Sequence, residues 1–233
     1  MLDDMHDLRA AVARFQTSAV VAGVPWHDMQ ERPGNLTAGE LCRVLGVDRI
    51  PEQILWLNGE ALPYGRVLPA GAFPARWDDA GQLLDALSAS VGVPFFWRHQ
   101  LPVLWYERVV FTFVVTGDRE GEIWRYQFEP DDWNPVRAAP SLLAMFTEWN
   151  RGFDAGVYAR QEWDDWLHVD AGALHGHALD SLAFPVHISQ YDQGELLRRR
   201  QAECGVDLAV AEDFEHIEAL TDEVDAVRKS LRL

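Results

Sequence analysis

Lysine is almost missing from this chain. Of its 20 Lys and Arg residues only Lys229 is a lysine, and the others are arginines. No Gly-Lys-Ser/Thr sequence is therefore present, which excludes a Walker-type phosphate-binding loop. An internal Schiff-base lysine is not expected either, because that chemistry needs a lysine amine.

Cysteine and long apolar runs are scarce too. Cys42 and Cys204 are the only cysteines, and we expect two free thiols, as is usual in the cytosol. No apolar run approaches the roughly 20 residues that span a bilayer. The first residues include Asp3, Asp4 and Asp7, where a secretory signal would be basic and then apolar. The sequence thus predicts a cytoplasmic protein that does not enter membranes.

Positive charge is in short supply overall. The 233 residues hold 37 Asp and Glu, which gives a net charge of −17. Nucleic acids and anionic membranes are bound through Lys and Arg, so neither is an expected partner. A basic protein would be attracted, although acidity can also serve solubility alone. At 48% hydrophobic residues, the chain can bury a sizeable core.

The first part of the chain carries helix signals. Apolar residues recur at helical spacing over residues 1–24. Thr37, with Glu40 three residues later, matches a capping box and predicts a helix start. Further short helices are expected at residues 51–59 and 78–92.

The centre of the chain predicts strands, because aromatic and β-branched residues gather there. The expected strands are residues 94–100, 101–107, 108–117 and 121–129. The connection 117–121 has the length of a hairpin turn. In the last strand Trp124 and Tyr126 alternate with Ile123 and Arg125. The tryptophan face is the more apolar, so we expect it to pack on helices.

The rest of the chain returns to helices. Ser141 precedes an amphipathic helix that should continue through residue 158. Residues 159–233 show weak periodicity and then two helical patterns. We predict an α+β fold in which an antiparallel sheet of about four to six strands is packed by helices, with an extra helical C-terminal extension.

A histidine-rich stretch is the main candidate for metal chemistry. It contains His168, Asp170, His175, His177, Asp180 and His187. Imidazole and carboxylate ligands suit zinc or iron, and His175 with His177 and an aspartate could serve a metal-assisted hydrolase. The spacing fits no established metal template, and no Gly-x-Ser-x-Gly or Rossmann fingerprint occurs. We therefore predict no metal, no cofactor and no catalytic residues.

Acidic residues flank several of the ten tryptophans. Aromatic rings among carboxylates can bind Arg or Lys by cation–π contact and charge together. Alternatives are local packing for the tryptophans, and turn formation or acid–base chemistry for the aspartate pairs. The candidate partner-binding residues are Glu129, Asp131, Asp132, Trp133, Trp163, Asp164, Asp165 and Trp166.

Three segments together resemble the SUKH superfamily of the Smi–Knr type. They are "RIPEQILWLNGE", "VLPAGAFPARWDDAGQLLDAL" and "PFFWRHQ…GEIWRYQFEPDDWNPVRAAPSLLAMFTEW". The resemblance covers residues 37–157, so we expect a domain over 1–158 with that core. Residues 159–233 would form an extension packed on it. The initial motif is short here, and the tail from Gln161 onward lies outside the family core.

The resemblance implies a non-enzymatic protein-binding domain. Bacterial members are immunity proteins that neutralise polymorphic toxins, many of them nucleases, and eukaryotic relatives are regulatory scaffolds. The expected partner is thus a basic toxin or a regulatory target. Two alternatives stay open: an assembly protein that forms homo-oligomers through its C-terminal helices, and the metal-dependent hydrolase.

Overall fold

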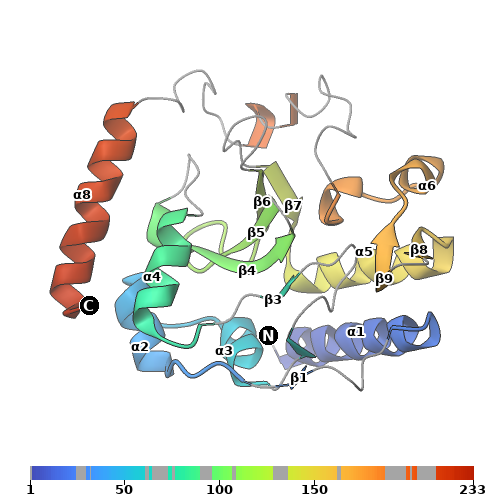
Figure 1. Cartoon of the computed structure of the whole chain (residues 1–233), viewed down its shortest axis with the longest axis horizontal. Helices are drawn as coiled ribbons and strands as arrows, with labels where there is room; N and C mark the ends of the chain where they lie inside the picture. The colour runs from blue at the N-terminus through green and yellow to red at the C-terminus, as the bar shows by residue number, and fades with distance from the viewer. Residues whose placement is uncertain are drawn as a thin grey trace.

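A five-stranded sheet forms the centre of the computed structural model, with helices around it (Figure 1). The structure describes residues 2–24, 30–31, 33–60, 63–64, 73–74, 77–89, 96–106, 109–127, 136–161, 164–186, 198–199, 201–203 and 214–233. The predicted α+β class is confirmed, including the C-terminal helix.

All neighbouring strands of the central sheet are antiparallel, in the order β3-β4-β5-β6-β7. The strands are β3 (Phe73–Pro74), β4 (Gln100–Tyr106), β5 (Val109–Val114), β6 (Ile123–Gln127) and β7 (Val136–Ala139). The turn between β5 and β6 uses Gly117 and Gly121 at φ 91 and φ 95, values that favour glycine. The hairpin predicted there is confirmed.

The expected strand at 94–100 is wrong for the part that the structure describes. Trp97–His99 is a 3₁₀ turn, η3, and β4 begins only at Gln100. Residues 90–95 lie outside the described residues. Trp97 is buried and its aromatic signal comes from core packing rather than from a strand.

Most other elements precede or follow the sheet in sequence. Before β3 come α1 (Leu2–Val21), β1 (Gln30–Glu31), α2 (Ala38–Leu45), α3 (Glu52–Gly59) and β2 (Pro63–Tyr64), while α4 (Ala80–Ala89) lies between β3 and β4. After it come α5 (Leu142–Ala155), β8 (Tyr158–Gln161), β9 (Asp164–Val169), α6 (Ala171–Gly176), η4 (Ser181–Ala183) and α8 (Phe214–Leu231). Residues 198–199 and 201–203 are also helical. No helix among these is both long and apolar enough to cross a membrane.

The helix ends follow their local sequence signals. The Thr37 side chain accepts from the Glu40 backbone N–H, and the Glu40 side chain accepts from the Thr37 N–H, which completes the predicted capping box. These hydrogen bonds lower the pKa of Glu40. At α5 the Ser141 hydroxyl accepts from the Ala144 N–H. Each bond satisfies a backbone donor that the first helical turn leaves open.

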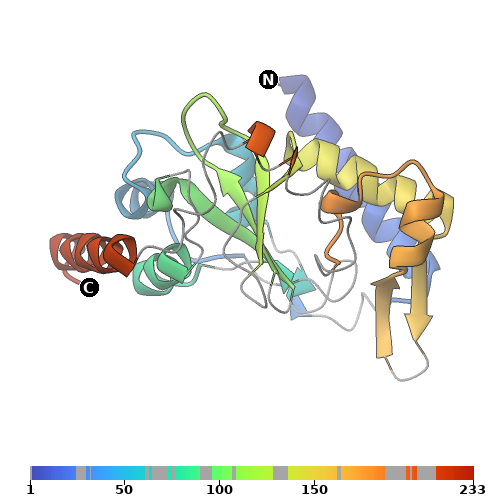
Figure 2. The ribbon, with the colours of Figure 1, turned by 90° about the horizontal axis from the view of Figure 1, so that it is seen from above.

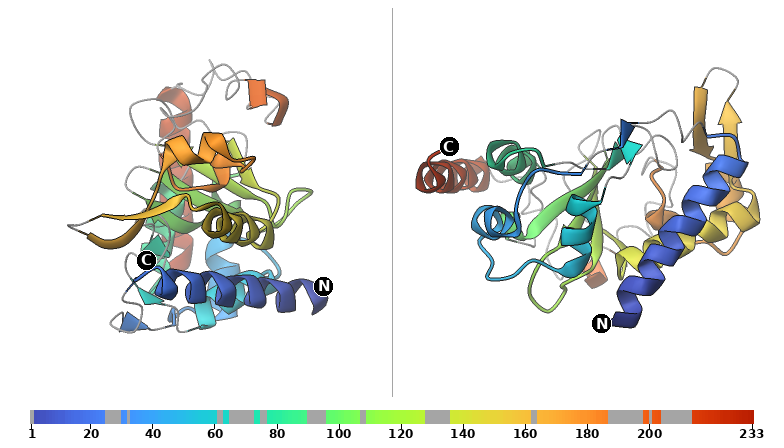
Figure 3. Two further views of the ribbon diagram at one scale, coloured as in Figure 1. Left: turned by 90° about the vertical axis from the view of Figure 1, so that its right-hand side faces the viewer. Right: turned by 90° about the horizontal axis from the view of Figure 1, so that it is seen from below.

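One hydrophobic core runs through most of the described chain. It joins Met5 and Phe15 of α1, Trp149 of α5 and Val224 of α8. Helices α1 and α5 lie side by side, as Figures 1 and 3 show. Cys42 is a free thiol, while Cys204 lies outside the described residues.

The prediction for the two faces of β6 is wrong. Ile123 belongs to the core that the helices share, whereas Trp124 and Tyr126 form a separate small cluster with Val110 and Val114. Arg125 lies on the helix-packed face and is fully buried. Hydrophobicity alone gave the wrong face because a buried arginine was counted as a polar, outward-facing residue.

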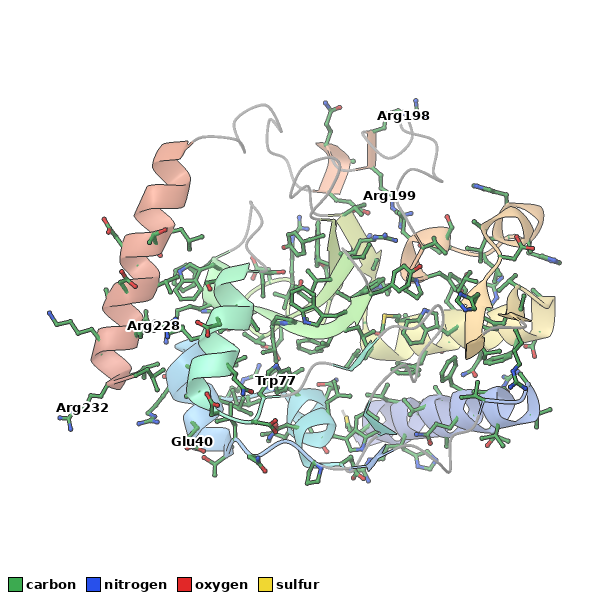
Figure 4. All side chains as sticks on the ribbon, viewed as in Figure 1. Glu40, Trp77, Arg198, Arg199, Arg228 and Arg232 are labelled. Atoms are coloured by element: carbon green, nitrogen blue, oxygen red, sulfur yellow. The ribbon has the colours of Figure 1, made fainter. Side chains whose placement is uncertain are left out.

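The last helix is attached at the opposite end of the molecule from β8 and β9 (Figures 1 and 2). Val224 is buried against the core. The Trp97 indole N–H donates to Glu223 Oε2 at 2.9 Å, and Arg228 pairs with Asp85 of α4 at 2.5 Å. Arg228 points toward α4 in Figure 4. Glu223 and Arg228 thus hold α8 against η3 and α4, on either side of Val224 along the helix.

Gly46→Ala is expected to destabilise the protein more than Gly156→Ala. Both glycines follow a helix with φ 70, where an alanine costs about 1 kcal/mol. A Cβ at Gly46 would also lie 2.8 Å from the Arg98 guanidinium, while nothing lies within 4 Å at Gly156. That guanidinium donates to the Arg43 and Val44 carbonyls at the end of α2. Urea unfolding of both variants measures the difference, and equal losses would contradict a role for Arg98 here.

Candidate protein-binding surface

The first predicted contact segment is framed by well-buried elements. Glu129, Asp131, Asp132 and Trp133 lie outside the described residues. The flanking residues are Gln127, which ends β6, and Val136, which begins β7. Val109, the first residue of β5, pairs with Gln127. The segment thus joins two paired strands at the end of the sheet where β4 passes into β5.

The second predicted contact segment falls in the hairpin of β8 and β9. Asp164, Asp165 and Trp166 are the first three residues of β9, and Trp163 lies outside the described residues. The hairpin extends outward from the body of the molecule (Figures 2 and 3).

The base of this hairpin is anchored in the core. Tyr158 and Val169 pair across the strands and pack on the main cluster. Leu167 packs with Ala19 of α1 and with Val24, which follows that helix. The Tyr158 hydroxyl donates to the Trp149 carbonyl at 2.8 Å. The hairpin therefore projects from a fixed base.

Tyr158→Phe is expected to cost about 1 kcal/mol at neutral pH, because one partly buried hydrogen bond is lost. Burial, and then the negative charge of Glu148, raise the pKa of Tyr158 well above its ordinary 10.0. Because the folded state disfavours the phenolate, the stabilisation by the Tyr158 hydroxyl is complete below the pKa of tyrosine in the unfolded chain. This stabilisation is lost as the pH rises from that value through the higher pKa of the folded state. As the pH rises, the midpoint of urea unfolding should fall less steeply in Tyr158→Phe than in the unaltered chain. An unchanged alkaline slope would contradict the burial of this hydroxyl.

The histidine-rich stretch is used for local structure. His168 lies in β9, His175 is in the last turn of α6, and His177 follows it. Asp170 caps α6 through the Ala173 N–H, and Asp180 caps η4 through the Leu182 N–H. His187 lies outside the described residues. Within the described ranges, no three His, Cys, Asp or Glu residues are grouped to hold a metal ion.

A hollow of about 320 Å³ lies beside this stretch, at the end of α5. Its charged lining residues already have partners. Arg151 pairs with Glu148 at 2.6 Å and donates to the Ala178 carbonyl. Asp154 pairs with Arg14 at 2.9 Å. Both charged lining residues are therefore paired, and the imidazole of His177 is the remaining titratable group of the lining.

Arg125 fastens the C-terminal extension to the sheet. Its guanidinium donates to the carbonyls of Phe184 at 3.1 Å and Val186 at 2.6 Å, and lies over the Phe111 ring. The Trp149 indole N–H donates to the Ala183 carbonyl at 2.8 Å. We call residues 180–186 the strap. Sequence reasoning missed this role, although an arginine among the apolar residues of a central strand was a visible signal.

An alternating row of charges links the strap to the sheet. Its members, which we call the ionic chain, are Arg119, Glu122, Arg137, Glu203, Arg199 and Asp180. In that order, neighbouring side chains pair at 3.9, 3.1, 3.8, 3.1 and 3.0 Å. These residues come from four separated parts of the chain, so no local sequence pattern could have joined them.

Comparison with known proteins leaves the family open. No family model matches the chain, and no curated protein matches it.

Proposed function

We propose that this chain is a non-enzymatic, immunity-type binding protein, similar to the SUKH superfamily, that neutralises a basic toxin such as a nuclease. The observation that carries the proposal is the surplus of negative charge, −17 overall. The α+β architecture, with a central antiparallel sheet and the helix α5 that follows it, supports the resemblance.

Part of this charge lies free on the surface. Seven exposed carboxylates form no hydrogen bond or ion pair in the described part of the chain. They are Asp7, Asp48, Glu52, Glu60, Asp118, Asp222 and Asp225. Free surface carboxylates create a field that speeds the approach of a basic partner and weakens as salt is added.

The two candidate contact segments would supply the specific contacts. Both combine tryptophan with aspartate, and both adjoin elements with buried bases. A tryptophan at an interface centre contributes much of the binding energy, so Trp133→Ala should weaken binding by about 1–3 kcal/mol. The fold should be unchanged in this variant, and a loss of folding would place Trp133 in the core instead.

A regulatory or assembly scaffold is the alternative role. Self-association through the C-terminal helices would need their apolar surface. Leu220, Val224 and Val227 of α8 already pack on the core of their own chain. This use of the stripe favours the binding role over assembly through α8.

The proposal is tested by capture and reconstitution. The purified chain is used as bait on lysate and secreted protein from the source cell, and captured proteins are identified by mass spectrometry. A basic protein that binds the purified chain one to one, with an association rate that falls as salt rises, is the expected result. A partner that is acidic or binds independently of salt would overturn the electrostatic basis of the proposal.

A further inference from the structure

Strand β7 forms one edge of the central sheet in the described part of the chain. Edge strands present backbone N–H and C=O groups that can pair with another chain, and proteins usually cover them. In β7 the Arg137 N–H does not bond to β6 but donates to Glu203 Oε2 at 3.0 Å. A carboxylate thus occupies a position that an added strand would use.

Glu203 is held in this position from several sides. Its carboxylate accepts from Arg199 Nε at 3.1 Å and lies 3.8 Å from Arg137 Nε. Its backbone carbonyl accepts from Arg119 at 2.5 Å. Only 12% of its side chain is exposed. Contacts to charged groups at low exposure are stronger than those of a surface pair.

Arg199 carries the connection onward to the strap. It pairs with both Asp180 oxygens, at 3.2 and 3.0 Å. Burial alone would lower its pKa, but hydrogen bonds to Asp180 and Glu203 outweigh this and raise it. Figure 4 shows Arg199 pointing toward the strap and Arg198 pointing away. The strap's η4 in turn contacts β7.

We propose that Arg199 and Glu203 guard the β7 edge, so that a second copy of this chain cannot pair its own β7 there. The partner is a second copy because antiparallel pairing of two identical edges has two-fold symmetry and closes on itself. Val136, Ala138 and Ala139 are buried, and Arg137 is the one charged residue of the strand. An uncovered β7 would therefore offer a short backbone edge for strand addition.

Glu203→Ala tests the guard, with Glu120→Ala as the control. Glu120 also pairs with an arginine, Arg49, at 2.7 Å, but it lies in the β5–β6 turn and is not a member of the ionic chain. Light scattering should give the single-chain mass of 26.4 kDa for the unaltered chain and the control. Glu203→Ala should give twice that mass. When the Glu203→Ala dimer is diluted until single chains form, amide hydrogens of residues 136–139 should exchange faster than in the dimer.

A second change distinguishes the edge from any other contact. Arg137→Pro in the Glu203→Ala chain removes the outward N–H and should restore the single-chain mass. A dimer that survives the proline overturns the proposal, as does a folded Glu203→Ala chain that stays single at the highest concentration. If circular dichroism shows Glu203→Ala unfolded, Arg199→Ala carries the same prediction, because it loosens the guard without removing Glu203.

Discussion

Arg125→Met should lower the free energy of unfolding by about 3 kcal/mol or more, since hydrogen bonds to a charged donor contribute about 1.5–3 kcal/mol each. The guanidinium is fully buried and donates to Phe184 and Val186 carbonyls. Methionine fills similar space but donates nothing, which leaves buried acceptors without their partner. The midpoint of urea unfolding measures the loss.

Arg49→Met is the matched control for this change. Arg49 also makes close contacts, to Glu120 at 2.8 and 2.7 Å, but its side chain is 71% exposed. Exposed ion pairs contribute about 0–1 kcal/mol, so the control should stay near the unaltered chain. Equal losses of stability in the two variants would contradict a stabilising role for the buried hydrogen bonds of Arg125 to Phe184 and Val186.

A chain ending at Tyr158 should not fold cooperatively. It lacks Phe184, which is fully buried against the main core, together with Leu182 and Ala183. The Trp149 indole would lose its acceptor, the Ala183 carbonyl. Loss of a fully buried phenylalanine alone costs about 3–5 kcal/mol, which approaches the whole stability of many domains. Thermal unfolding followed by circular dichroism should show no sharp transition.

A chain ending at residue 213 is the companion variant. It lacks only α8, whose buried anchor is Val224, and keeps the strap. We expect this chain to unfold cooperatively at a lower temperature than the full chain. A sharp transition in the chain ending at Tyr158 would instead make residues 159–233 a separable appendage.

Local chemistry made much of the fold predictable. The Thr37–Glu40 capping box, the glycines of the β5–β6 turn and the Ser141 cap all act over a few residues, and the structure has each of them. Strands β4, β5 and β6 followed from their aromatic and β-branched content. Such signals need no knowledge of the rest of the molecule.

Contacts between distant segments were not predictable. Arg125 looked like a solvent-facing residue because its acceptors lie more than 55 positions further along the chain. The β8–β9 hairpin was missed because its inner face combines Tyr158 and Arg160 with Leu167 and Val169, a pattern with weak alternation. The pairing of Glu203 with Arg137 likewise depends on tertiary structure.

The candidate contact residues have a similar explanation. Tryptophan among aspartates is a compositional signal, and it does not specify whether the side chains face solvent or the core. The structure fixes the strands that flank both segments, and it places Asp164, Asp165 and Trp166 at the start of β9. The contact role of all eight residues remains a prediction from the sequence.

The most direct test of the immunity role is whether the chain neutralises its captured basic partner. The partner's toxic or nuclease activity is measured while the purified chain is added in increasing amounts. An immunity protein should abolish this activity at one chain per partner, and the activity should return when high salt separates the two. Full activity in a saturated complex would contradict the immunity role and favour a regulatory scaffold.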